Sequence, residues 1–136
     1  MFAPTTRILV IDDMSSIRDL VKNTLKAMGY DKITLAEDGQ QGLDILLRLR
    51  DTPESIELVI SDWNMPVLKG LDLLKTVRAD KRWRDLPFVL LTSESEREQV
   101  TEAVLAGVSQ YIVKPFTLKI FEEKLKGAYN KHNKPS

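Results

Sequence analysis

The chain has 136 residues, and its 20 basic and 20 acidic side chains give a formal net charge of zero at pH 7. This length predicts one domain, numbered 1–136, with a single site and its surrounding surfaces. No basic stretch is interleaved with aromatic residues, which argues against nucleic-acid binding. The absence of cysteine excludes a disulfide framework, a thiolate zinc site and a catalytic thiol.

The N-terminal residues 1–6 show neither a basic segment nor the apolar core of a signal peptide. No apolar run approaches the ~18 residues of a membrane span. We therefore expect a soluble protein of the cytoplasm that does not bind membranes. The single histidine, His132, lies in a polar stretch, and residues 130–136 are expected to form a flexible, solvated tail.

Short apolar runs alternate with amphipathic helical patterns, which is typical of the parallel β/α units of an α/β fold. Strands are expected near residues 7–11, 33–36, 57–61, 87–91 and 110–113. Helices are expected over about 16–28, 38–50, 70–79, 96–106 and 117–129. Such an alternation allows a sheet wound in both directions, in which ligands bind beyond the carboxyl ends of the strands.

Local signals mark where several of these helices begin and end. Gly29 is a stop signal for the first helix. Asp38 with Gln41 and Ser95 with Glu98 have the spacing of capping boxes at the starts of the second and fourth helices. The polar segment 50–57 is expected to connect the second helix to the third strand.

Acidic residues end two of the predicted strands. Asp12 and Asp13 follow the first apolar run, and Asp62 follows the third. In adjacent parallel strands these carboxylates would repel each other by about 4 kcal/mol per pair at ~4 Å and an effective dielectric near 20. A positive charge must therefore lie among them. Oxygen ligands in a shallow site favour Mg²⁺ over a fully caged Ca²⁺. A turn or helix-start role would explain any one of these acids but not all three at one edge.

Two further strand ends deliver a hydroxyl and an ammonium group. Thr92 and Ser93 follow the fourth apolar run, and Lys114 follows the fifth. Lys114 offers a compensating charge for an anion on Asp62. Pro115 comes next, and X-Pro bonds can adopt the cis form in tight turns; a cis Lys114–Pro115 bond would fix the direction of the lysine side chain. From position alone, Thr92 is equally well a strand-end hydroxyl without a further role.

These motifs resemble the receiver domain of two-component response regulators, and in particular the CheY-like chemotaxis receivers. The matching residues are Asp12-Asp13, Asp62-Trp63-Asn64-Met65-Pro66, Thr92-Ser93-Glu94 and Lys114-Pro115-Phe116. The resemblance covers nearly the whole chain. It implies a flavodoxin-like, doubly wound sheet of five parallel strands in the order 2-1-3-4-5, with five helices.

The resemblance also implies the roles of individual residues. Asp62 would accept a phosphoryl group from a histidine kinase. Asp13 and Asp62 would bind Mg²⁺ directly, Asn64 through its backbone carbonyl, and Asp12 through water. The metal and Lys114 would stabilise charge in the phosphoryl transition state.

A switch and its output surface are implied as well. The Thr92 hydroxyl would bond the new phosphoryl group, and the Tyr111 ring would turn inward into the vacated space. Tyr111 and Lys124 match positions at which such receivers meet their targets, while Asn64 and Glu94 match positions that tune dephosphorylation. The implied partners are a CheA-like histidine kinase, a FliM-like flagellar motor switch protein and a phosphatase, with the receiver acting as a monomer.

The chain departs from the family pattern at three places. Met14 replaces an aromatic residue that often follows the acidic pair. The segment Leu47–Glu57 is longer than its counterpart in enterobacterial receivers. The stretch Glu96-Arg97-Glu98 stands where those receivers carry lysines, so partner identity does not transfer directly.

Three alternatives stay open at this point. The chain could be a stand-alone receiver that passes phosphate along a phosphorelay or regulates a kinase. It could be a Mg²⁺-dependent phosphatase with Asp62 as nucleophile, although Asn64 stands where such enzymes carry a second acid. A flavodoxin-like cofactor carrier is disfavoured, because Asp12 and Asp13 would repel a flavin phosphate.

Overall fold

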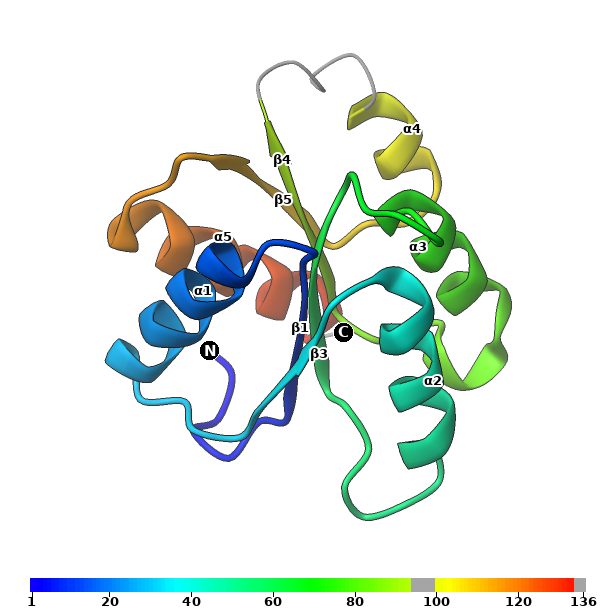
Figure 1. Ribbon diagram of the computed structural model, residues 1–136. Coiled ribbons are helices and arrows are strands. Elements are labelled where there is room, and N and C mark those ends of the chain that lie inside the picture. The colour runs from blue at the N-terminus through cyan, green and yellow to red at the C-terminus, as the bar shows by residue number, and fades with distance from the viewer. Residues whose placement is uncertain (94–99, 134–136) are drawn as a thin grey trace.

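A computed structural model describes residues 1–93 and 100–133. The strands are β1 (Ile8–Ile11), β2 (Ile33–Ala36), β3 (Leu58–Asp62), β4 (Phe88–Ser93) and β5 (Gln110–Lys114). The helices are α1 (Ser15–Ala27), α2 (Gly39–Leu49), α3 (Gly70–Ala79), α4 (Val100–Leu105), α5 (Leu118–His132) and the short 3-10 helix η1 (Lys81–Trp83). Figure 1 shows three layers, with α1 and α5 on one face of the sheet and α2, α3 and α4 on the other.

The sheet is parallel throughout, and its strand order is β2-β1-β3-β4-β5. This confirms the flavodoxin-like, doubly wound order that the resemblance implies. The chain winds outward from β1 to β2 and then returns to the other side of β1 to form β3. The winding therefore reverses between β1 and β3, which is where such sheets place their ligand sites.

Alternate residues of the strands supply two separate cores. Ile8 and Val10 of β1 face α1 and α5, where they join Phe121 and other buried residues. Leu9 and Ile11 face the opposite layer, which contains α2, α3 and α4. Both faces of a parallel sheet are covered by helices, so its strands are apolar without alternation. This explains why short apolar runs located the strands.

The start of α2 contains the predicted capping interactions. The Asp38 carboxylate accepts a hydrogen bond from the Gln41 backbone N–H at 2.8 Å. The Gln41 side chain accepts one in return from the Glu37 N–H at 2.6 Å, one residue before the cap. Together these bonds satisfy backbone donors that a helix start leaves without partners.

The predicted end of the fifth helix was wrong. Helix α5 continues to His132, so residues 130–132 are helical and do not belong to a solvated tail. The His132 ring is half-buried, and its Nε2 lies 2.6 Å from the Ser109 Oγ. A tertiary contact thus extends a helix whose sequence becomes polar.

The predicted Ser95–Glu98 cap lies outside the described residues.

The longer connection between α2 and β3 packs against η1. The sequence patterns did not predict this short helix. Arg50 pairs with Asp80 at 3.0 Å, and Arg82 pairs with Asp51 at 2.8 Å. The connection precedes β3, so it lies at the edge of the sheet opposite the acidic residues. The extension therefore leaves the acidic edge unaltered.

No helix in the part of the chain that the structure describes is both long and apolar enough to cross a membrane.

Candidate functional site

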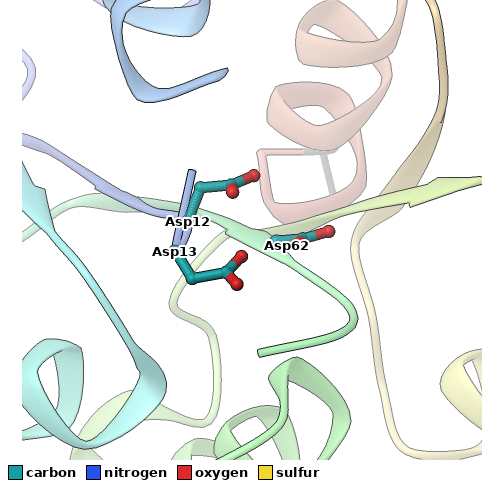
Figure 2. A group of neighbouring side chains, drawn as sticks. All are labelled: Asp12, Asp13 and Asp62. Carbon is teal, nitrogen blue, oxygen red and sulfur yellow. The ribbon is translucent and has the colours of Figure 1, made fainter. Parts of the chain in front are cut away.

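The three predicted acids meet at the carboxyl edge of β1 and β3. Asp12 and Asp13 come directly after β1, and Asp62 is the last residue of β3. One carboxylate oxygen from each residue lies within 4.8 Å of the others (Figure 2). Asp12 and Asp62 are buried, whereas Asp13 is exposed. Within residues 1–93 and 100–133, this is the one group of three or more such side chains close enough to share an ion.

One carboxylate oxygen of Asp12 accepts a hydrogen bond, and the other has no hydrogen-bond partner among the described residues. Its Oδ1 accepts a hydrogen bond from the Met14 N–H at 2.9 Å. Its Oδ2 is buried and has no hydrogen-bond partner among the described residues. Burial raises the pKa of Asp12 to about 6; the Met14 bond opposes this shift and the nearby Asp62 charge adds to it. A buried oxygen in this position is suited to a cation or to water bound to a cation.

Asp62 is almost fully buried but has two donors on one oxygen. Its Oδ1 accepts from the Lys114 Nζ at 3.0 Å and from the Trp63 backbone N–H at 2.9 Å. Burial raises the pKa of Asp62, and the bond and charge of Lys114 act against that rise. The Lys114–Pro115 peptide bond is cis. Lys114 therefore reaches from the end of β5 to the carboxylate at the end of β3.

This donor set fits Mg²⁺. Three carboxylates share the site with Lys114, so negative charge is in excess, and the unsatisfied Asp12 oxygen marks one place that a positive charge would stabilise. The ligand atoms are hard oxygens, and the exposed Asp13 leaves one side accessible to water and to a phosphoryl group.

The remaining predicted site residues lie on neighbouring elements. Asp62 pairs in register with Leu91, so Thr92 is one residue further along β4, where it is fully buried. Tyr111 on β5 is half-buried, and the Lys124 Nζ of α5 lies 4.7 Å from the centre of its ring. Asn64 is exposed in the loop after β3. Glu94 lies outside the described residues.

Several groups at the site were missed by the sequence reasoning. The Arg18 guanidinium donates to the backbone oxygen of Asp12 at 2.7 Å. The Met14 N–H could have been found, because an Asp side chain often accepts from the N–H two residues later. Gly70 has a role as well, because a Cβ there would overlap the carbonyl oxygen of Asp62. Helix α3 can therefore begin directly against the strand that carries Asp62.

The doubly wound parallel sheet thus places three acids at its winding reversal, where Lys114 reaches them from the end of β5. Residues 8–126 match the model of the response regulator receiver domain, and the chain belongs to this family. The CheY homolog of Campylobacter jejuni is 43% identical over 119 residues, which cover 88% of each chain. CheY-3 of Vibrio cholerae is 44% identical over 119 residues, again 88% of each chain. The solved structure of Vibrio cholerae CheY4 has a TM-score of 0.77 at 32% identity and covers 90% of this chain and 97% of that one. The chain is thus a CheY-like response regulator receiver.

Mg²⁺ should bind saturably and change the fluorescence of Trp63. The backbone N–H of Trp63 donates a hydrogen bond to the Asp62 carboxylate. The chain has two tryptophans, so the titration uses the Trp83→Phe protein, in which Trp63 is the remaining emitter. Asp13→Ala should weaken the apparent affinity by at least about 10-fold, because loss of even an indirect partner of a metal costs that much.

Asp31→Ala is the matched control for this titration. Asp31 is exposed in the connection before β2, at the opposite edge of the sheet, so its removal should leave the affinity unchanged. Equal affinities of the Asp13→Ala protein and the control protein would contradict the assignment of the metal site.

Proposed function

We propose that this chain is a single-domain response regulator that accepts a phosphoryl group on Asp62 and then changes its affinity for a target protein. The observation that carries the proposal is the setting of Asp62. It is buried at the winding reversal, bonded to Lys114 at 3.0 Å and close to two further carboxylates. A nucleophilic carboxylate needs positive charge beside it to accept a phosphoryl group, and this site provides a lysine and carboxylates suited to a metal ion.

The proposed donor is a phosphohistidine of a histidine kinase. An Asp62 oxygen forms the new P–O bond while the P–N bond to the imidazole breaks, and the released imidazole takes up a proton. Lys114 stabilises the negative charge that spreads over the phosphoryl oxygens. Asp13, Asp62, the Asn64 carbonyl and, through water, Asp12 would hold Mg²⁺, which when bound offsets that same charge. Little covalent chemistry is needed beyond this, because phosphoryl transfer depends mainly on positioning and electrostatics.

The proposed output depends on Thr92 and Tyr111. Thr92 comes from the strand next to Asp62, so its hydroxyl is a suitable group to bond the new phosphoryl oxygen. Tyr111 pairs in register with Leu90 of β4, two residues before Thr92, and its ring contacts Lys124. A change at Thr92 would therefore act on a surface formed by β5 and α5. Asn64 and Glu94 are proposed to control water access and hence the intrinsic dephosphorylation of Asp62.

The proposed partners are a CheA-like kinase, a FliM-like flagellar motor switch protein and a phosphatase. Support comes from the relatives in Campylobacter jejuni and Vibrio cholerae, whose names describe them as chemotaxis proteins. An output to another target in a phosphorelay is the second candidate, since the acidic stretch Glu96-Arg97-Glu98 changes the charge in a region where related receivers bind.

Direct binding to a peptide from a flagellar motor switch protein tests this proposal. The peptide should bind more tightly in the presence of Mg²⁺ and beryllofluoride, which imitates a phosphoryl group on Asp62. Transfer of phosphate from this chain onto a second histidine domain, without peptide binding, would favour the phosphorelay. Repeated turnover of small phosphate esters would instead indicate a phosphatase.

A further inference from the structure

The turn between α4 and β5 is held by side chains of α3 and α5. Arg78 of α3 donates from Nε to the Gly107 carbonyl at 2.9 Å. Lys131 of α5 donates to the Val108 carbonyl at 2.9 Å. The next residue, Ser109, has its Oγ 2.6 Å from the Nε2 of His132. All of these contacts lie at the amino edge of the sheet, opposite the acidic site, and Asp62 and its neighbours take no part in them.

The bonds of Ser109 favour a neutral His132 ring. Ser109 is buried, and its Oγ accepts from the Phe88 N–H at 2.9 Å and from the Arg78 Nη2 at 3.3 Å. A hydroxyl has two lone pairs and one proton. With two donors on its lone pairs, the Ser109 hydroxyl is left to donate its proton to the Nε2 of His132, 2.6 Å away. This arrangement favours a neutral ring that carries its own proton on Nδ1.

Protonation of the ring is incompatible with this arrangement. An imidazolium is a donor at both nitrogens, so Nε2 could no longer accept from Ser109. Two cations, Arg78 and Lys131, also face the ring and disfavour a positive charge on it, while Asp85 favours one. Glu57 and Met1 line the same hollow beside the ring.

We propose that His132 is a pH-sensitive latch: the neutral ring ties the last turn of α5 to the α4–β5 turn, and protonation releases it. The ring lies on the helix that carries Lys124, and its partner Ser109 immediately precedes the strand that carries Tyr111. Release therefore loosens the C-terminal end of α5 and the N-terminal end of β5, the two elements that bring Lys124 and Tyr111 together.

The direction of the pH effect follows from the surroundings of the ring. Burial, and secondarily Arg78, lower the pKa of His132 below its ordinary value of 6.5. The unfolded chain therefore takes up a proton at a higher pH than the folded chain does. The latch contributes its full stability above pH 6.5, and that contribution is lost as the pH falls from 6.5 through the folded-state pKa.

Because His132 is the single histidine, the imidazole NMR signals of the intact chain report on it without ambiguity. Above pH 6.5 the nitrogen shifts should show an unprotonated Nε2 and a protonated Nδ1, and the ring should titrate below 6.5. The protection factors of the amides in the last turn of α5, which correct the exchange rates for their intrinsic pH dependence, should fall over the same pH range. A proton on Nε2 in the neutral ring, or a pKa at or above 6.5, would overturn the proposal.

Two substitutions separate the latch from other pH effects. His132→Gln keeps a neutral acceptor at every pH, and His132→Lys places a positive donor there at every pH. Wild type and His132→Gln should have similar melting temperatures above pH 6.5, and the melting temperature of wild type should fall below that of His132→Gln as the pH drops under 6.5. His132→Lys should be less stable than His132→Gln throughout.

The comparison is internally controlled, because the titration of Asp12 and of the other acids away from the ring is common to all three proteins and cancels in the differences. A difference between wild type and His132→Gln that does not change with pH would show that the ring is only a packing residue, and would also overturn the proposal.

Discussion

Asp62→Asn is expected to reduce phosphorylation to background. The Asn side chain is almost the same size and can still accept a hydrogen bond from Lys114, so the buried site keeps its shape. An amide oxygen is neutral and a far weaker nucleophile than a carboxylate, so the acyl phosphate cannot form. The measurement is incubation with a small phosphodonor and Mg²⁺, followed by reductive trapping and mass spectrometry of the modified residue.

Two controls make this result specific. Asp31→Asn removes an exposed carboxylate from the opposite edge of the sheet and should label as well as wild type. Wild type in excess chelator should remain unlabelled, because the transition state then lacks the charge that the metal supplies. Label at Asp13 or elsewhere in the Asp62→Asn protein would show that the wrong carboxylate has been assigned as acceptor.

Thr92→Ala is expected to separate phosphorylation from output. Coupling free energies between two sites are typically about 1–3 kcal/mol, so phosphorylation should raise the affinity of wild type for its target roughly 5- to 150-fold. The Thr92 hydroxyl would bond the phosphoryl group only in the active packing, so Thr92→Ala should lose most of that gain. It should still accept phosphate on Asp62, since the acids, the metal ligands and Lys114 are all retained.

The measurement is the affinity for the target fragment with and without beryllofluoride, in wild type and in the variant. Thr92→Ser is the matched control, because it keeps the hydroxyl at the end of β4 and should keep most of the gain. The signal of the Tyr111 ring provides a second readout, since Tyr111 should change its environment in wild type and in Thr92→Ser but not in Thr92→Ala. An undiminished gain in Thr92→Ala would disprove this switch while leaving Asp62 as the acceptor.

Much of the fold could be predicted from local patterns. The strands were located by their apolar runs because a parallel sheet is covered on both faces and tolerates few polar residues within a strand. The start of α2 was located by Asp38 and Gln41, since capping involves residues only a few positions apart. The strand order required the family resemblance, because apolar periodicity does not say which strands pair.

The chemical character of the acidic edge could also be predicted. Asp12, Asp13 and Asp62 follow strands, and parallel strands bring their carboxyl ends to one edge, so sequence position placed them at the same edge. That they lie near each other followed from the strand order that the resemblance implies. The same reasoning placed Lys114 and Thr92 at that edge. The residue types then limited the chemistry to a hard cation and an anionic ligand.

Only the tertiary structure decided how these groups are bonded. The contact between Lys114 and Asp62 joins residues 52 positions apart, and the unsatisfied oxygen of Asp12 depends on how deeply β1 is buried. The polar end of α5 was misjudged for the same reason. His132 and Ser109 are 23 positions apart, and no local pattern indicates that a serine just before β5 would hold a histidine at the end of the last helix. Local sequence determines which residues face the sheet or a strand end, whereas hydrogen bonds between distant elements depend on packing that only the complete fold specifies.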